Sequence, residues 1–158
     1  QLDIPADVRV LVVEDNPVNQ LVIDSILKSA GIKARLAHNG AEALHETNKN
    51  TLPWDLVFMD CEMPVMDGLE ATRRLREMEA ERGQANSWVI GLSAHALADH
   101  VQRARNSGMD DYLTKPVTRE DVLTALSGAV LRTRDGARNQ EARNTAPVIP
   151  LRSPRRDS

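Results

Sequence analysis

Short apolar runs alternate along the chain with longer amphipathic stretches. The apolar runs lie near residues 8–14, 33–38, 55–60, 88–93 and 111–114, and the amphipathic stretches lie near residues 17–30, 40–50, 67–81, 97–107 and 118–132. Runs of about four to eight apolar residues are typical of buried strands, and the longer periodic stretches are typical of helices. The alternation therefore predicts an α/β fold in which each strand is followed by a helix.

The composition of the strands and of their boundaries refines this prediction. Pro17 suits the first turn of a helix, and Gly31 stands where a left-handed helix end is expected. The runs Val10–Val13 and Leu56–Met59 are apolar throughout, so helices should cover both faces of the sheet. We expect a doubly wound, five-stranded parallel sheet with the flavodoxin-like strand order 2-1-3-4-5, in which the first and third strands are neighbours.

The length of 158 residues leaves room for one domain and a tail. We expect residues 1–7 to be an N-terminal linker and residues 8–132 to form the domain. Residues 133–158 contain three prolines and six arginines without an apolar period, so we expect a disordered basic tail or an interdomain linker. The chain starts at Gln1 without a signal-like segment, which suggests a piece of a longer protein.

Charge and cysteine content narrow the function classes. Residues 133–158 hold six basic and three acidic residues of the 20 and 23 in the chain, so residues 1–132 hold 14 and 20. An acidic domain is a poor nucleic-acid binder. One cysteine, Cys61, suits a reducing compartment, so we expect a cytoplasmic location. No run of about 18 apolar residues occurs, so we expect no membrane contact by this segment.

Charged residues follow three of the predicted strands. Glu14 and Asp15 end the first, Asp60 ends the third, and Lys115 follows the fifth. Because the carboxyl ends of parallel strands meet at one edge, these four groups should lie close together. Three neighbouring carboxylates would repel one another unless a cation lies among them. A divalent metal together with Lys115 is therefore expected, and phosphate fits as the anionic guest.

Four motifs resemble the receiver domains of two-component signalling. They are VVEDNPVNQ at Val12–Gln20, MDCEMPVMDG at Met59–Gly68, LSA at Leu92–Ala94 and DYLTKP at Asp111–Pro116. The resemblance covers residues 8–131, and the first motif is most similar to receivers of hybrid sensor histidine kinases. It implies a domain that takes a phosphoryl group onto an aspartate and switches conformation in a phosphorelay. Its expected partner is a histidine kinase or a histidine phosphotransfer domain.

The resemblance also implies residue roles. Asp60 becomes the phosphoacceptor, because a carboxylate can act as a nucleophile. Mg²⁺ prefers oxygen ligands, so Asp15 and Asp60 fit as direct ligands. The backbone carbonyl of Glu62 is the implied third ligand, and Glu14 is expected to act through a bound water. The Lys115–Pro116 bond is expected to be cis, which turns the ammonium towards the phosphoryl group.

Ser93 and Tyr112 each allow two interpretations. Ser93 ends the fourth strand, where a serine commonly caps the next helix, and Tyr112 fits as a half-buried aromatic whose hydroxyl meets water. The resemblance instead implies that both are switch residues. In that case Ser93 bonds the phosphoryl group, and Tyr112 turns inward as the loop after Ser93 moves.

The remaining reactive side chains suggest no second site. The four histidines, which are His38, His45, His95 and His100, lack metal-ligand spacing and are expected at the surface or in loops. His95 lies two residues after Ser93, so it is placed to influence water access to an acyl phosphate, as is the Glu62 side chain. Cys61 has no partner in its motif, and buried packing is its expected role.

The predicted helix at residues 17–30 has more apolar positions than one buried stripe needs. We expect some of them, in particular Val18 and Ile23, to be exposed near Asp60 as a docking surface for the phosphohistidine partner. The alternative is that all of them pack on the sheet.

Three alternative functions stay open. The parent is either a hybrid kinase or a stand-alone response regulator without an output domain. An aspartate-nucleophile phosphatase shares the aspartyl phosphate and Mg²⁺, but such enzymes usually show Asp-x-Asp, whereas here Glu62 stands two residues after Asp60. A degenerate receiver that serves only as a docking module would lack Mg²⁺-dependent phosphorylation.

Overall fold

The strands and helices of the computed structural model follow the predicted order. The structure describes residues 4, 5, 7–50 and 52–145, and for residues 133–145 it describes the backbone alone. The strands are β1 (Val10–Val13), β2 (Arg35–Ala37), β3 (Leu56–Asp60), β4 (Trp88–Ser93) and β5 (Asp111–Thr114). The helices are α1 (Pro17–Ser29), α2 (Gly40–Lys49), α3 (Gly68–Arg82), α4 (Ala98–Ser107) and α5 (Arg119–Thr145).

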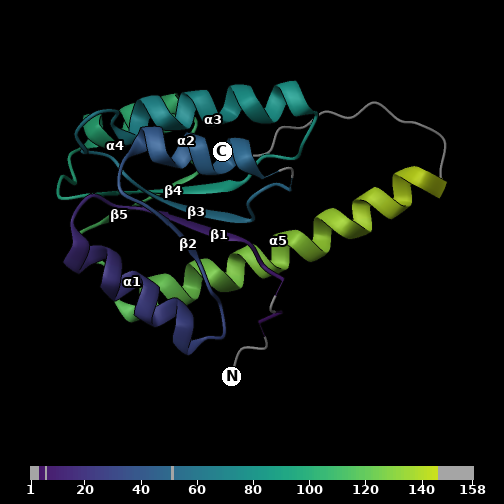
Figure 1. Ribbon diagram of the computed structural model, residues 1–158. Helices are drawn as coiled ribbons and strands as arrows, with labels where there is room; N and C mark the ends of the chain where they lie inside the picture. The colour runs from purple at the N-terminus through teal and green to yellow at the C-terminus, as the bar shows by residue number, and fades with distance from the viewer. Residues whose placement is uncertain (1–3, 6, 51, 146–158) are drawn as a thin grey trace.

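The five strands form one parallel sheet in the order β2-β1-β3-β4-β5, as predicted. Helices α2, α3 and α4 cover one face of the sheet, and α1 and α5 cover the other (Figure 1). Val13 of β1 pairs with Met59 of β3, so the residues after β1 and the end of β3 are neighbours. The predicted switch point therefore lies between β1 and β3, at the edge where the carboxyl ends of the strands meet.

Each face of the sheet has its own hydrophobic core because side chains alternate along a strand. Val12, Phe58 and Ile90 pack with α1 and α5, whereas Leu11, Val57 and Val89 belong to the cluster on the side of α2, α3 and α4. All six side chains are buried. The continuous apolar runs are thus explained by helices on both faces.

Helix α1 corrects one prediction. Its N-cap is Asn16, whose side chain accepts hydrogen bonds from the backbone N–H groups of Val18 and Asn19. Ile23 was expected at the surface, but it is only 2% exposed and packs in the core with Leu27. The apolar residues of α1 form two stripes with helical spacing, and the contacts of α1 with β1 and α5 determine that the stripe containing Ile23 is the buried one.

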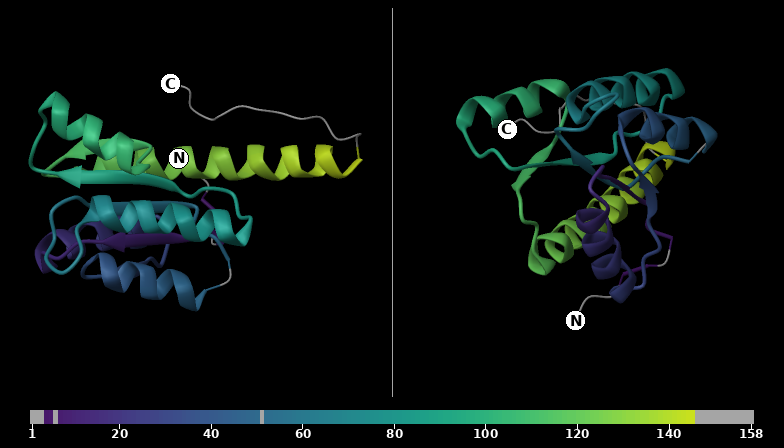
Figure 2. Two further views of the ribbon diagram at one scale, coloured as in Figure 1. Left: turned by 90° about the horizontal axis from the view of Figure 1, so that it is seen from above. Right: turned by 60° about the vertical axis from the view of Figure 1, so that its left-hand side comes forward.

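Helix α5 corrects a second prediction, because it continues to Thr145 instead of ending near residue 132. Residues 133–145 are helical even though they lack an apolar period. Their alanines, arginines, glutamine and glutamate are good helix formers, and the first proline after Thr118 is Pro147. The C-terminal part of α5 projects past the sheet, away from the carboxyl ends of the strands (Figure 2, left). Residues 146–158 of the predicted tail lie outside the described residues.

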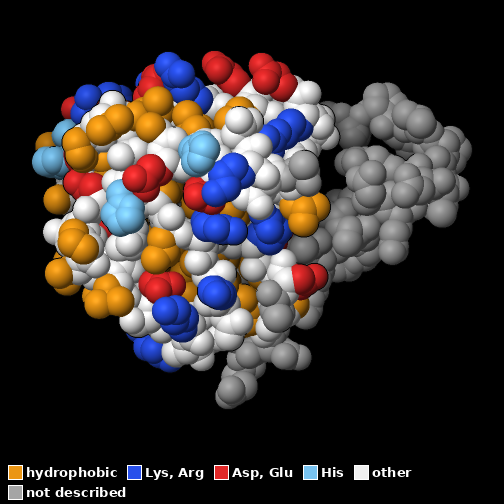
Figure 3. All heavy atoms as spheres, in the orientation of Figure 1, with side chains coloured by type: hydrophobic (Ala, Val, Ile, Leu, Met, Phe, Trp, Pro, Cys, Tyr) orange, Lys and Arg blue, Asp and Glu red, His pale blue; other side chains and the backbone are white. Residues whose placement is uncertain are grey.

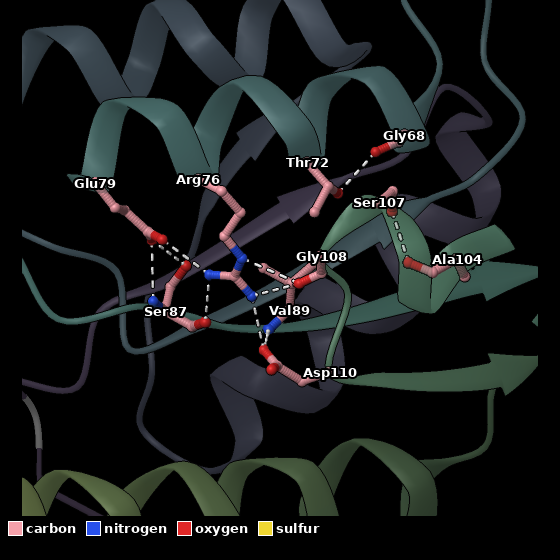
Figure 4. Close-up of polar contacts among 10 residues, drawn as sticks. All are labelled: Gly68, Thr72, Arg76, Glu79, Ser87, Val89, Ala104, Ser107, Gly108 and Asp110. Atoms are coloured by element: carbon pink, nitrogen blue, oxygen red, sulfur yellow. Dashed lines mark hydrogen bonds and ion pairs between the residues drawn. The ribbon is translucent and has the colours of Figure 1, made fainter. Parts of the chain in front are cut away.

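A buried polar network ties α3 to the starts of β4 and β5 (Figure 4). The Arg76 guanidinium donates to the carbonyl oxygens of Gly108 and Ser87 and forms ion pairs of 2.8 Å with Glu79 and Asp110. Glu79 in turn accepts hydrogen bonds from the backbone and the hydroxyl of Ser87. Because these groups lie at the edge opposite the carboxyl ends of the strands, their role is to fix α3 and the α4–β5 turn on the sheet.

No helix in the described part of the chain has both the length and the apolar character needed to cross a membrane.

Candidate functional site

Four charged side chains meet at the carboxyl ends of β1, β3 and β5, as predicted. Oxygen atoms of Glu14, Asp15 and Asp60 all lie within 4.8 Å of one another. Lys115 Nζ lies 3.2 Å from Glu14 Oε1 and 3.2 Å from Asp60 Oδ1. Glu14 and Asp60 are buried, whereas Asp15 is exposed. The cluster thus has two buried carboxylates, one exposed carboxylate and a single partly buried ammonium group.

Backbone contacts fix the position of Glu14. Its N–H donates to the Ala37 carbonyl at the end of β2, and its Oε2 accepts a hydrogen bond from the Asn16 backbone at 3.1 Å. The buried Gln20 side chain donates to the carbonyl oxygens of both Glu14 and Ala37. Gln20 was not among the predicted site residues, although its place in the first motif pointed to it. It holds the acidic end of β1 against β2.

Lys115 reaches the cluster from the loop after β5. Its backbone N–H donates to the Ser93 carbonyl at 2.8 Å, which continues the pairing of β4 and β5. The Lys115–Pro116 bond is cis, as the resemblance implies. Burial works against the ammonium charge, but the Asp60 and Glu14 carboxylates outweigh it and raise the pKa of Lys115. Lys115 is therefore a fixed positive charge at neutral pH.

The pKa of the Asp60 carboxyl group lies far from its ordinary value. Burial raises the pKa of Asp60 to about 8, with further upward contributions from Glu14 and Asp15 and a smaller opposing one from Lys115. Its Oδ1 contacts Lys115 and accepts the Glu62 backbone N–H at 3.2 Å, whereas its Oδ2 is buried and has no hydrogen-bond partner in the described part of the chain. A buried acceptor of this kind is unfavourable unless a further group binds it.

The residues present fit a divalent cation. The donor atoms are all carboxylate oxygens, which suit Mg²⁺, and the Asp60 Oδ2 atom is available to it. Three carboxyl groups lie around the one ammonium group of Lys115, and Glu14 and Asp15 add to the effect of burial in raising the pKa of Asp60. A second positive charge would therefore be bound favourably by this arrangement of side chains.

The loop after β3 closes over Asp60 through a glycine. Gly68 begins α3, and its backbone N–H donates to the Cys61 carbonyl at 3.1 Å. A Cβ atom at Gly68 would collide with the Asp60 carbonyl oxygen, so only glycine allows this close approach. Cys61 is buried, and burial raises the pKa of its thiol to about 12. It packs in the core, as predicted, and stays protonated.

Ser93 and Tyr112 are joined through His95. The Ser93 hydroxyl contacts the Glu62 carboxylate, with Oγ 2.9 Å from Oε2 and 3.2 Å from Oε1. The backbone N–H of His95 donates to Ser93 Oγ at 3.0 Å, and the Tyr112 hydroxyl donates to the His95 carbonyl at 2.7 Å. The half-buried Tyr112 is thus bonded to the loop after β4. The Glu62 side chain, whose role the sequence left open, contacts a predicted switch residue.

The histidines lie at the surface or in loops, as predicted. The imidazole of His38 contacts Glu42 on α2, and His45 is exposed on the same helix. The rings of His95 and His100 stack with their centroids 4.6 Å apart. The only group of three or more potential metal ligands in the described part of the chain is the one formed by Glu14, Asp15 and Asp60.

An apolar patch lies on α1, the helix that follows the acidic end of β1. It consists of Val18, Leu21 and Val22, which are 67%, 63% and 44% exposed. Figure 3 shows hydrophobic side chains gathered on the surface over α1. Val18 is exposed, as predicted. Ile23 was predicted to be the second exposed residue, but Leu21 and Val22 are exposed instead. Val65, in the loop after β3, is also exposed.

The family model for the response regulator receiver domain matches residues 10–127. The sensor histidine kinase GacS of Pseudomonas protegens is 40% identical over 136 residues, which cover 84% of this chain and 15% of GacS. Hybrid signal transduction histidine kinases of Dictyostelium discoideum are 35% to 37% identical and are likewise covered over a small part of their length. The chain therefore spans less than a sixth of these relatives.

Solved structures support the same assignment. A chain in the co-crystal structure of the Saccharomyces cerevisiae phosphotransfer protein Ypd1 with the receiver domain of Ssk1 matches with a TM-score of 0.76 and 32% identity. The match covers 84% of this chain and 94% of that one. The receiver domain of a Pseudomonas aeruginosa sensor histidine kinase, solved with magnesium in its active-site cleft, matches with a TM-score of 0.67 and 36% identity over 79% and 98% of the two chains. This chain belongs to the family of response regulator receiver domains, which act in two-component signal transduction.

Proposed function

We propose that Asp60 accepts a phosphoryl group from a phosphohistidine and that the domain acts as a conformational switch in a phosphorelay. The observation that carries this proposal is the state of the Asp60 carboxylate. It is buried beside Glu14, Asp15 and Lys115, and its Oδ2 atom has no hydrogen-bond partner among the described residues. A carboxylate held in this way is positioned to form a bond with an electrophile that enters from the edge of the sheet.

The transfer conserves atoms and charge through simple substitution at phosphorus. One oxygen of Asp60 forms a bond to the phosphorus atom while the bond from phosphorus to the donor imidazole nitrogen breaks. The imidazole leaves with that electron pair and afterwards takes up a proton. The protein contributes positioning and charge neutralisation, which dominate catalysis of phosphoryl transfer.

Mg²⁺ is the proposed cofactor. Asp15 and Asp60 would bind it directly, the backbone carbonyl of Glu62 would complete the protein ligands, and Glu14 would act through a water molecule. When bound, Mg²⁺ neutralises the clustered carboxylates and the incoming phosphoryl oxygens. The ionised form of Asp60 then predominates at neutral pH, and that form is the nucleophile. The magnesium-bound receiver structure from Pseudomonas aeruginosa supports this assignment.

Lys115 and Ser93 are proposed to contact the phosphoryl oxygens. Lys115 already lies beside Asp60, and its backbone bond to Ser93 links the two residues. The hydrogen bond from Tyr112 to the His95 carbonyl and the one from the His95 N–H to Ser93 give the loop after β4 a defined resting position. A phosphoryl group that draws Ser93 towards Asp60 would therefore disturb the contact of Tyr112. This is the proposed route from the modification to the surface around α4 and β5.

The proposed partner is a histidine phosphotransfer domain or a histidine kinase that docks on the apolar patch of α1. The Ypd1–Ssk1 complex among the similar structures supports a partner of this kind. The relatives support a hybrid sensor histidine kinase as the parent protein, which would place this domain in the cytoplasm. Docking through Val18, Leu21 and Val22 would bring a phosphohistidine to the adjacent Asp60 edge.

A titration with beryllofluoride, an analogue of the phosphoryl group, tests the proposal. In the presence of Mg²⁺ the amide NMR signals near Asp60, Ser93 and Tyr112 should shift to a new saturated position. The Asp60→Asn variant, in which the carboxylate is lost with little change of shape, should not respond. A response that persists in this variant, or one that is unchanged when a chelator removes Mg²⁺, would contradict the proposed site.

A further inference from the structure

The hydroxyl proton of Ser93 is already engaged in this structure. A carboxylate accepts hydrogen bonds and cannot donate them, so in the contact between Ser93 Oγ and Glu62 the hydroxyl is the donor. The backbone N–H of His95 occupies an acceptor position on the same oxygen. Because a hydroxyl carries a single proton, Ser93 cannot donate to Glu62 and to a phosphoryl oxygen in full at the same time.

This contact is the end of a chain of hydrogen bonds. Tyr112 donates to the carbonyl of His95, the N–H of His95 donates to Ser93, and Ser93 donates to Glu62. The charged acceptor strengthens the bond from Ser93 and, through the shared hydroxyl, the bond from the His95 N–H, whereas Tyr112 is connected to this pair through the backbone of His95. Ser93 is fully buried, which gives its hydroxyl few alternative partners.

The segment that these bonds hold has little other support. Residues 94–99 are exposed, and the N-cap of α4, Leu97, makes no side-chain capping hydrogen bond. The stacking of the His95 and His100 rings fixes His95 only against the first turn of α4 itself. The bonds to Ser93 and Tyr112 are therefore what attach the start of this segment to the sheet.

We infer that the Glu62 side chain acts as an internal competitor of the phosphoryl group for the Ser93 hydroxyl. In the resting domain it retains Ser93, and through His95 it also retains Tyr112. Phosphorylation then has to replace the Glu62–Ser93 bond, so Glu62 is a positioning residue that sets how readily the domain switches. The inference deepens the proposed function and rests on it, because it takes Ser93 to be a ligand of the phosphoryl group.

Glu62 also carries a negative charge beside an anion site, and this simpler effect has to be separated. Glu62→Gln removes the charge but keeps an acceptor oxygen for Ser93, whereas Glu62→Ala removes both. Ser93→Ala removes the hydroxyl. In that background Glu62 can influence the site only through its negative charge. Glu81→Ala, on the exposed last turn of α3, removes the same charge away from the site and serves as the control.

The test is a double-mutant cycle read by beryllofluoride titration with Mg²⁺. Glu62→Ala should lower the concentration needed for half-saturation by about three- to tenfold, the size expected for release of one hydrogen bond. Glu62→Gln should lower it less. In the Ser93→Ala background the effect of Glu62→Ala should shrink at least threefold, and Glu81→Ala should change nothing. An equal effect of Glu62→Ala in both backgrounds would overturn the inference.

A second readout needs neither Mg²⁺ nor beryllofluoride. In the free domain, Glu62→Ala should shift the amide signal of His95 and the ring signals of Tyr112, and it should add little to the shifts caused by Ser93→Ala. Unchanged signals in Glu62→Ala would overturn the inference even if beryllofluoride binds normally. A wild-type domain that fails to bind beryllofluoride would instead contradict the proposed function.

Discussion

The Nζ atom of Lys115 lies 3.2 Å from Oδ1 of Asp60, although Asp60 ends β3 and Lys115 follows β5, with β4 between these strands. The same nitrogen lies 3.2 Å from Oε1 of Glu14. Both acidic side chains are buried, and the positive charge of Lys115 offsets part of the free-energy cost of burying them in the absence of metal. The ion pairs therefore contribute to the fold as well as to the chemistry of the site.

Replacement of Lys115 should accordingly destabilise the metal-free domain. Lys115→Met removes the ammonium partner of the buried Glu14 carboxylate and of the buried Asp60 carboxyl group, and the free energy of unfolding should fall by about 1–3 kcal/mol. Asp15→Asn is the matched control, because it removes an exposed negative charge from the same cluster and should leave stability unchanged or raise it. Urea unfolding in the presence of a chelator measures both effects. A Lys115→Met variant as stable as wild type would show that the pairs are not stabilising.

The raised pKa of Asp60 predicts how stability depends on pH. Because its pKa is about 8 in the folded domain and 3.8 as the ordinary value, the folded state binds the proton more tightly. The resulting stabilisation is fully present below about pH 4 and is lost as the pH rises through about 8. Within this range the free energy of unfolding of the metal-free domain should fall by at most about 1.4 kcal/mol per pH unit from this group.

Two comparisons isolate this contribution. Asp60→Asn has no proton to titrate, so its stability should depend less on pH than that of wild type over this range. Saturating Mg²⁺ should also flatten the dependence, because a bound cation favours the ionised carboxylate. Chemical unfolding at several pH values measures the slopes. Equal slopes for wild type and Asp60→Asn would mean that another group carries the proton.

The apolar patch on α1 predicts a difference between neighbouring positions. Leu21→Glu places a charge at an exposed position, so it should leave the fold and the reaction with a small phosphodonor intact while it slows transfer from a phosphohistidine protein. Ile23→Glu places a charge in the core and should unfold the domain. Transfer assays with both kinds of donor, together with circular dichroism, distinguish the two outcomes. A Leu21→Glu variant with normal protein-to-protein transfer would place the docking surface elsewhere.

The network of Arg76 should matter for stability but not for phosphorylation. Arg76→Met removes the guanidinium that pairs with the partly or fully buried Glu79 and Asp110 carboxylates, and we expect the free energy of unfolding to fall by about 2–4 kcal/mol. Arg73→Met is the control, because Arg73 is exposed and its ion pair with Glu70 lies at the solvent-facing surface, where such a pair contributes little to stability. Labelling of Asp60 at a temperature where the variant is folded should be unchanged. If Arg76→Met is as stable as Arg73→Met, the Arg76 network does not stabilise the fold.

The sequence predicted the elements and the charged cluster because both depend on local pattern. Each strand is an apolar run, and in a parallel sheet the residues that follow such runs share one edge, which brings Glu14, Asp60 and Lys115 together. The burial of Ile23 was mispredicted because α1 has two apolar stripes, and only its packing partners decide which one faces inward. The end of α5 was mispredicted because residues 133–145 form a helix without the apolar period on which the prediction relied.

The parts of the site that escaped prediction depend on close packing. Nothing in the motif around Gly68 indicates that its Cα lies against the Asp60 carbonyl. The bonds of Gln20 and the contact of Glu62 with Ser93 join segments whose relative position is known only in three dimensions. A polar side chain in a loop can point to solvent or to a neighbour, and the sequence does not distinguish the two.

The most direct test of the proposed role of Asp60 is to identify the residue that is phosphorylated. The domain should be incubated with a small-molecule phosphodonor, with and without Mg²⁺, and the modified residue located by mass spectrometry. We expect one Mg²⁺-dependent phosphoryl group on Asp60, absent from Asp60→Asn and strongly reduced in Asp15→Asn. Labelling at another residue, or labelling of Asp60 that is equally fast in excess chelator, would contradict it.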